Sequence, residues 1–243
     1  MTKLLYMDSI DACYETQFEA TVNLTRPDWI QLDQTLFYPL GGGQNWDTGT
    51  LTLEDGTTLE VNEVTKRGPV KHVVGADHGL EHGAVVKGAI DWDRRYAHMR
   101  MHTAQHLVSG IAYEMFNEVR TVGNQIHADR SRIDFNPIQF TPEMMSDLEA
   151  ATNDAIKAGS PITNVTMTRD EINALMPEAR TNMDLLPKSV TELRVIRIGD
   201  DVDLCPCAGT HVRNTKEIGE VQFLGRKGKG KGTQRLEYAL VES

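Results

Sequence analysis

The apolar positions within residues 100–116 recur with the period of an α-helix. In this stretch, RMHTAQHLVSGIAYEMF, Leu107, Ile111 and Met115 follow one another at intervals of four residues. Residues four apart lie side by side on one face of a helix, and an apolar face packs against a core. The pattern therefore predicts a helix over about 94–117.

The first 90 residues alternate between polar and apolar positions over short stretches, which is typical of β-strands. Examples are FEATVNL and LTLEDGTTLEV, and the run from Glu54 to Thr57 predicts a hairpin turn. His72, His78 and His82 lie among glycines, with no cluster of thiolates or carboxylates nearby. We expect them to be loop histidines and not a second metal site.

Two further helices are predicted from their end signals. Thr141 as N-cap and Pro142 at the first helical position begin one helix, which ends near Gly159. A capping box over Thr168–Glu171 begins a short helix that ends before Pro177.

Strands are predicted in three apolar stretches of the C-terminal half: ELRVIRI (192–198), EVQFLG (220–225) and RLEYALV (235–241). The chain as a whole is therefore expected to be α+β. Its expected parts are an all-β domain over 1–90 and a domain of mixed helices and strands over 91–243.

The composition is that of an acidic protein. The 243 residues include 25 Lys and Arg against 35 Asp and Glu, a formal net charge of −10. The sequence contains no run of about 18 apolar residues, and MTKLLYMDSIDACYE does not resemble a signal peptide. Three cysteines fit a reducing compartment. We expect a cytoplasmic protein that does not contact membranes.

Two short motifs carry the candidate chemistry. His102 and His106 are four apart on the predicted helix, and Cys207 and His211 are four apart in a predicted loop. Three imidazoles and one thiolate form a ligand set suited to tetrahedral zinc. A metalloprotease site is excluded, because Thr103 occupies the position where that motif has its glutamate.

Spacing alone does not determine which residues form each of the two ligand pairs. His98 lies four residues before His102 and extends the same stripe, and Cys205 lies two residues before Cys207. A disulfide between Cys205 and Cys207 would be strained and is rare in the cytosol. Cys13 is remote in sequence and is expected to be a small core residue.

Two glycine-rich segments are candidate binding elements. Lys227, Lys229 and Lys231 alternate with glycines, which suits phosphate contact at a hairpin tip; a loop that only improves solubility is the alternative. The run Gly41–Gly43 before Gln44 allows positive φ angles and close backbone approach to a ligand, with an ordinary wide turn as the alternative.

Five blocks of sequence, in order, resemble the AlaX family of free-standing alanyl-tRNA editing proteins, in its medium-sized subclass, and the editing domain of alanyl-tRNA synthetase. They are FYPLGGGQNWDTG (37–49), DWDRRYAHMRMHTAQH (91–106), NQIHADRSRIDF (124–135), DLCPCAGTHVRNTKEIG (203–219) and GKGKGTQRLEYAL (228–240). The resemblance covers nearly the whole chain. One departure is Ala208, where the family often has glycine.

The resemblance implies a fold and a ligand set. It implies a small translation-factor-like β-barrel over 1–90, followed by a zinc-binding editing domain over 91–243. The implied ligands, for one Zn²⁺ per chain, are His102, His106, Cys207 and His211. His98 and Cys205 are then packing or neighbouring residues.

The resemblance also implies an activity, the hydrolysis of the ester between serine and mischarged tRNA(Ala). Gly-tRNA(Ala) is a second candidate substrate. The residues implied for catalysis are Thr121 and Gln125. The residues implied for substrate or tRNA contact are Gly42, Gly43, Gln44, Lys227, Lys229, Lys231 and Arg235. The alternatives are a zinc-stabilised tRNA-binding module without catalysis and editing of another mischarged tRNA, such as a threonine-type substrate.

Overall fold

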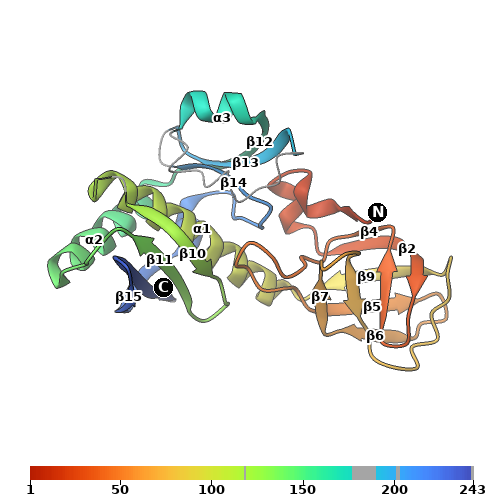
Figure 1. Cartoon of the computed structure of the whole chain (residues 1–243). Helices are drawn as coiled ribbons and strands as arrows, with labels where there is room; N and C mark the ends of the chain where they lie inside the picture. The colour runs from red at the N-terminus through yellow and green to blue at the C-terminus, as the bar shows by residue number, and fades with distance from the viewer. Residues whose placement is uncertain (118, 177–189, 201–202, 242–243) are drawn as a thin grey trace. The chain divides into compact units, whose positions relative to one another are not determined.

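The structure is a computed structural model of the chain. It describes four stretches of residues: 1–117, 119–176, 190–200 and 203–241. The chain divides into two compact units, Met1–His98 and Met99–Ser243. Figure 1 shows the chain coloured from red at the N-terminus to blue at the C-terminus. Among the described residues, no helix combines the length and the apolarity that a membrane span requires.

The first unit is built from antiparallel strands. Within the described residues, seven of them form one sheet in the order β6-β5-β9-β2-β3-β8-β7. Their bounds are β2 Gln17–Thr25, β3 Trp29–Leu32, β5 Gly49–Leu53, β6 Thr58–Val61, β7 Glu63–Thr65, β8 Lys71–Val73 and β9 Val85–Ile90. The remaining elements are short: β1 (Lys3–Leu4) paired in parallel with β4 (Gln34–Thr35), and the 3₁₀ turns η1 (Leu5–Met7) and η2 (Asp11–Tyr14).

One face of this sheet forms the core of the first unit. Along β9, Val86 and Ile90 are buried while Val85 and Lys87 are exposed, as expected for a strand with one buried face. The fully buried core residues of the unit include Val22, Ile30, Leu32, Leu36, Phe37, Leu51 and Val64. The alternation in FEATVNL and LTLEDGTTLEV thus predicts β2, β5 and β6 correctly.

The barrel expected over 1–90 is not a closed ring of paired strands. Within the described residues, the sheet ends at β6 and β7, which do not pair with each other. These two strands are consecutive in the chain and are separated only by Asn62. One bent segment therefore pairs with β5 through its first half and with β8 through its second, and the ladder is interrupted at the bend.

The hairpin predicted from Glu54 to Thr57 is confirmed. It joins β5 to β6, with Leu53 N–H donating to Thr57 O (2.8 Å) and Gly56 N–H donating to Leu53 O (3.0 Å). Gly56 has a φ of +87°, a conformation that glycine adopts without steric cost.

The prediction that His72 is a loop histidine is wrong. It lies in β8, is fully buried, and its Nε2 is 2.9 Å from Thr35 Oγ1. The Phe37 ring packs edge-on against it at a centroid distance of 5.7 Å. A strand of three residues is too short to show alternation among the flanking prolines and glycines, so the sequence pattern missed it.

His72 should make the stability of the first unit depend on pH. Burial lowers the pKa of His72 from 6.5 to about 4. As the pH falls through this window, the unfolded chain binds a proton here and the folded chain does not, so the folded state loses stability. The full loss corresponds to about 3 kcal/mol. The contribution of neutral, buried His72 to the free energy of unfolding is therefore complete above pH 6.5 and decreases as the pH falls toward 4.

Urea unfolding at pH 7 and pH 4.5 measures this effect. The difference in unfolding free energy between the two pH values should be smaller in His72→Gln than in the wild type. His82→Gln, at an exposed loop position, should behave like the wild type. Equal pH dependence in all three proteins would contradict the assignment.

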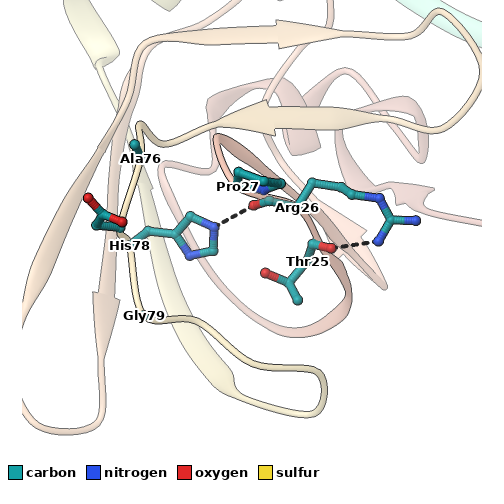
Figure 2. Close-up of a pocket in the computed structure, with 7 residues that line it drawn as sticks. Thr25, Arg26, Pro27, Ala76, His78 and Gly79 are labelled. Carbon is teal, nitrogen blue, oxygen red and sulfur yellow. Dashed lines mark hydrogen bonds between the residues drawn. The ribbon is translucent and has the colours of Figure 1, made fainter.

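His78 and His82 lie in the loop between β8 and β9, as predicted. Figure 2 shows His78 Nε2–H donating to the carbonyl of Arg26 (2.8 Å), and His78 Nδ1 accepts from Leu80 N–H (3.0 Å). The bond to Arg26 connects the loop to the turn between β2 and β3, and residues of both line a surface pocket of about 490 Å³. Among the described residues, no metal-ligating group other than the one formed by the predicted ligands is present.

The long predicted helix is α1 (Trp92–Met115), which begins in the first unit and continues into the second. Asp91 caps it, because its Oδ1 accepts from Arg94 N–H (3.1 Å). Both ends of the helix lie two residues before the predicted bounds of 94–117. In the second unit, Tyr238 O–H donates to Met101 O (2.8 Å) and fixes the helix against the C-terminal strand.

Within the residues that the structure describes, the second unit contains two antiparallel sheets. One has the order β10-β11-β16-β15, with β10 Arg120–Gln125, β11 Ser131–Asn136, β15 Glu220–Gly230 and β16 Thr233–Val241. The other has the order β12-β13-β14, with β12 Ile162–Thr168, β13 Glu192–Ile198 and β14 Asp203–Pro206. The other elements in the described part of this unit, besides α1, are α2 (Pro142–Ala158), α3 (Arg169–Leu175) and the 3₁₀ turn η4 (Thr215–Ile218).

The predicted helix ends are confirmed. The Thr141 side chain accepts from Met144 N–H at the start of α2, and Gly159 ends that helix in the left-handed conformation. Thr168 and Glu171 form the predicted capping box of α3. Antiparallel sheets combined with helices give a mixed helix and sheet fold, which agrees with the expected α+β class.

Candidate metal centre

The two predicted half-sites meet in the second unit. His102 and His106 lie one turn apart on α1, with their ring centroids 5.2 Å apart, and Cys207 and His211 lie in the loop after β14. One ligand atom from each of the four residues lies within 4.8 Å of the others. The three histidines are buried. The group can therefore hold a metal ion.

The separations within this cluster match a tetrahedral site. Cys207 Sγ is 3.5 Å from His102 Nε2 and 3.4 Å from His211 Nε2. A tetrahedral zinc bound to sulfur at about 2.3 Å and to nitrogen at about 2.0 Å places such atoms about 3.5 Å apart. The donor set and these separations both fit Zn²⁺.

His98 and Cys205 are not part of this cluster, so the structure brings together the four residues that the resemblance implies. His98 is fully buried, and Cys205 pairs with Ile196 in the β13–β14 ladder. Cys13 is fully buried, as expected for a small core residue. Ala208 does not have a positive φ, so its methyl group is compatible with the loop.

Two side chains orient the histidines of the cluster. Thr103 O–H donates to Met99 O (2.8 Å), so its oxygen is left to accept from His211 Nδ1–H (3.2 Å). Asp203 Oδ2 lies 2.7 Å from His106 Nδ1 and accepts a hydrogen bond from its N–H. Both contacts leave Nε2 of the histidine directed to the cluster. Such contacts set the tautomer and ring angle of metal ligands.

The cluster concentrates charge on two of its members. Burial raises the pKa of Cys207, but the three neighbouring histidines outweigh burial and lower its pKa well below the ordinary value. Burial lowers the pKa of His106, but the Cys207 thiolate and Asp203 outweigh burial and raise its pKa to about 10. Burial lowers the pKa of His102 and His211. The thiolate, which is the metal-binding form of cysteine, is therefore favoured.

Arg194 on β13 supports the loop that carries Cys207. Its Nη1 donates to Cys207 O (2.8 Å) and to Gly209 O (3.0 Å). Its Nε and Nη2 are buried, and they have no acceptor among the described residues. A buried donor without a partner costs about 1–3 kcal/mol, and a hydrogen bond to an acceptor would relieve this cost.

Of the two residues implied for catalysis, Thr121 forms a side-chain hydrogen bond to α1, and the side chain of Gln125 forms one to β11 instead. Thr121 Oγ1 donates to Ser109 Oγ (2.8 Å). Gln125 Oε1 accepts instead from Arg132 Nε on β11 (3.0 Å).

The glycine segment of the first unit forms a tight turn. Gly42 and Gly43 have φ values of +55° and +85°, and the flanking Gly41 and Gln44 exchange backbone hydrogen bonds (2.9 and 3.2 Å). Two successive positive φ angles are the property of a type I′ turn, which favours glycine at both positions. Gln44 is fully buried. The segment is therefore a narrow, hydrogen-bonded turn and not the wide turn that was the alternative from sequence.

A buried ion pair holds this segment to the first turn of α1. Asp47 Oδ2 accepts from Tyr38 N–H (2.7 Å) and from Arg95 Nε (3.0 Å), and the charged groups of both Asp47 and Arg95 are fully buried. Arg95 also donates to the carbonyls of Cys13 and Leu36. The ends of the glycine segment are therefore fixed by charge-assisted hydrogen bonds.

The basic segment lies at the end of the β15–β16 hairpin. Lys231 has a φ of +50° and forms the turn with Gly232, while Lys227 and Lys229 lie within β15 and are exposed. Arg235 differs from them, because its guanidinium makes two hydrogen bonds to Asp134 (2.7 and 3.0 Å). The three lysines are accessible to a partner, and Arg235 is already paired.

Two family models match parts of the chain. The model described as threonyl and alanyl tRNA synthetase second additional domain matches residues 193–237, which include Cys207 and His211. The model described as tRNA synthetases class II (A) matches residues 6–94.

Relatives of the same length decide the family. An alanyl-tRNA editing protein AlaX-M of Methanosarcina barkeri is 38% identical over the whole of both chains. Another, of Saccharolobus solfataricus, is 35% identical over 99% of both chains. The chain belongs to the AlaX-M family of alanyl-tRNA editing proteins. It is also 33% identical to an alanine–tRNA ligase of Thermococcus kodakarensis, with the match covering all of this chain and 26% of that enzyme.

In this AlaX-M family member, sequence reasoning missed Asp203, Arg194 and the orienting role of Thr103. In the sequence alone, Thr103 indicates only that a metalloprotease site is excluded. Asp203 lies four residues before Cys207 but 97 residues after its partner His106. The available signal was that a metal-binding histidine requires a carboxylate, carbonyl or hydroxyl for its second nitrogen.

Removing the Asp203 carboxylate should weaken metal binding without removing a proposed ligand. Asp203→Ala leaves His106 Nδ1 without its acceptor, so zinc affinity should fall by about 10- to 100-fold. Competition with a chromogenic chelator measures the affinity. Asp200→Ala, an exposed carboxylate in the same segment, is the matched control and should bind zinc like the wild type. Equal affinities for all three proteins would contradict the orienting role.

Proposed function

We propose that this chain is a zinc-dependent aminoacyl-tRNA deacylase that hydrolyses the ester joining serine to tRNA(Ala). The observation that carries the proposal is the buried cluster of three histidines and one cysteine, in a chain that matches alanyl-tRNA editing proteins along its whole length. In this proposal His102, His106, Cys207 and His211 hold one Zn²⁺ per chain. Gly-tRNA(Ala) is a further candidate substrate.

When bound, zinc would supply a Lewis acid that polarises the ester carbonyl or a water molecule. The protein contributes the orientation of His106 through Asp203 and of His211 through Thr103. Arg194 contributes two buried donors that can bind an ester oxygen as negative charge develops on it.

A hydrolytic site of this kind would add to the discrimination between serine and alanine. Serine differs from alanine by one hydroxyl, and a pocket built for alanine rejects that added group poorly. A second site that hydrogen-bonds the hydroxyl can reject alanine strongly, because alanine leaves a buried polar group unpaired. In our proposal Thr121 belongs to this hydroxyl-recognising site.

We assign the two parts of the chain to different tasks. Residues 1–90 would form the domain that carries the glycine motif, and residues 91–243 the editing domain. Gly42 and Gly43 would contact the substrate through their backbone, which the absence of side chains leaves accessible. Gln44, which is buried, would hold the shape of this turn.

Lys227, Lys229 and Lys231 should bind tRNA through its phosphates. Each phosphate contact steepens the fall of affinity with salt, with a slope of about −0.7 on single strands and −0.9 on duplex. Replacing all three lysines by alanine should therefore weaken tRNA binding and flatten its salt dependence, as measured by filter binding at several salt concentrations. The control removes the same charge elsewhere, at the exposed residues Lys3, Lys66 and Lys87. A hairpin variant with the control's salt slope would show that the loop does not contact phosphate.

The second candidate function is a tRNA-binding module in which zinc is purely structural. A complete set of four protein ligands favours it, because catalytic zinc sites commonly leave one position open. Deacylation assays with Ser-, Gly- and Ala-tRNA(Ala), and with another tRNA mischarged with threonine for the threonine-type alternative, distinguish the possibilities. Release of serine from tRNA(Ala) supports the deacylase, and tRNA binding with no release from any substrate supports the module.

A further inference from the structure

The pairing of β10 with β11 contains a bulge. Thr121 pairs with Phe135 and Gly123 pairs with Asp134, so Val122 is an extra residue in β10. In a regular strand, residues three apart point to opposite faces. One extra residue reverses this parity, so that the side chains of Thr121 and Asn124 point to the same face.

Both of these side chains reach α1. Thr121 Oγ1 donates to Ser109 Oγ (2.8 Å), and Asn124 Nδ2 donates to Gln105 Oε1 (3.1 Å). Gln105 Nε2 in turn donates to Ser109 Oγ (2.9 Å), so the four side chains form one connected network. Gln125, the next residue along β10, points to the other face and bonds to Arg132.

The network adjoins the candidate metal ligands. Gln105 follows His102 by three residues, and Ser109 follows His106 by three residues. Residues three or four apart on a helix have Cβ atoms about 5–6 Å apart, so the two histidines and the two network residues share one face of α1. Gln105 is 6% exposed, and Ser109, Thr121 and Asn124 are partly exposed, so the network is partly open to solvent.

The network has an unused donor and an unused acceptor. Ser109 Oγ accepts two hydrogen bonds, and its own hydroxyl hydrogen has no acceptor among the described residues. Asn124 uses its Nδ2, and its Oδ1 has no donor within the same described stretches. A hydroxyl group is both a donor and an acceptor, so a ligand hydroxyl is chemically complementary to this unused donor and acceptor.

We propose that Asn124 and Ser109, connected through Gln105, recognise the side-chain hydroxyl of the amino acid to be removed. This rests on the proposed deacylase function and names the residues that select its substrate class, aminoacyl esters with a β-hydroxyl. Ser109 donates to the hydroxyl oxygen and Asn124 accepts the hydroxyl hydrogen. Gln125 takes no part in recognition, because the bulge directs it away from α1.

Two variants and one matched control test the proposal. Asn124→Leu and Ser109→Ala each remove one polar group with little change of shape, and Gln222→Leu makes the same kind of change at an exposed position of β15. The first measurement is the ratio of kcat/KM for Ser-tRNA(Ala) to that for Ala-tRNA(Ala), in preparations of equal zinc content. The ratio should fall by about 5- to 150-fold in Asn124→Leu and Ser109→Ala and stay unchanged in Gln222→Leu.

The second measurement does not depend on catalysis. Adenosine analogues in which serine or alanine is joined to the 3′ position by a stable amide bond serve as ligands. The zinc-loaded wild type should bind the serine amide more tightly than the alanine amide, and Asn124→Leu and Ser109→Ala should lose this preference.

The outcomes separate this proposal from the deacylase function. An equal slowing of both substrates in Asn124→Leu and Ser109→Ala would indicate a structural role and overturn the proposal. The same loss of preference in Gln222→Leu would also overturn it. If the wild type hydrolyses neither ester, the deacylase function fails, and the amide analogues still decide whether the network binds a hydroxyl.

Discussion

Cys207→Ala is expected to lose its bound zinc and with it all deacylase activity, whereas Cys205→Ala should retain both. The Cys207 sulfur lies 3.5 Å from His102 Nε2 and 3.4 Å from His211 Nε2, the separations of ligands around one tetrahedral ion. The pKa of the Cys207 thiol is also lowered well below the ordinary value by the three neighbouring histidines, so Cys207 supplies the negative charge of the site. Apparent binding free energies of structural zinc are about 10–16 kcal/mol, and losing the thiolate removes a large part of this.

Cys205 is a demanding control because it lies only two residues away. It belongs to β14, pairs with Ile196, and is not part of the cluster. Elemental analysis of both variants, expressed as zinc per chain, measures the difference. Equal zinc loss in the two variants, or full retention in Cys207→Ala, would show that the ligand set is wrong.

The wild type is expected to hydrolyse Ser-tRNA(Ala) about 5- to 150-fold faster than Ala-tRNA(Ala). The alanine substrate lacks the hydroxyl that would pair with the polar groups of the pocket, and an unpaired buried group costs about 1–3 kcal/mol. Thr121→Val nearly preserves volume and removes one hydroxyl, so it should reduce the serine preference and leave the zinc content unchanged.

Thr166→Val provides the control for this substitution, because Thr166 is an exposed threonine on β12. It should keep the wild-type preference. Initial rates with both substrates, measured at matched protein and zinc concentrations, give the ratio for each protein. A wild type that hydrolyses both esters at the same rate would contradict hydroxyl recognition.

The candidate ligands could be predicted from the sequence because local geometry determines each pair. His102 and His106 are adjacent on any α-helix that contains both, and Cys207 and His211 are close in any short loop. The choice of His106 over His98, and of Cys207 over Cys205, could not be made from spacing. It came from the family resemblance, and the structure groups the same four residues.

Contacts between distant segments could not be predicted in this way. Asp203 reaches His106 across 97 residues, and no periodic pattern indicates this contact. The bulge in β10 decides whether Asn124 or Gln125 reaches α1, and it depends on pairing with β11. Similarly, the strand that buries His72 is defined by its partners β3 and β7 more than by its own three residues.

Release of serine from Ser-tRNA(Ala), compared between the zinc-loaded wild type and Cys207→Ala at equal protein concentration, tests the central claim most directly. The account predicts rapid release by the wild type and release at the rate of spontaneous hydrolysis by the variant. A wild type that holds one zinc per chain, binds the tRNA and leaves the ester intact would contradict it.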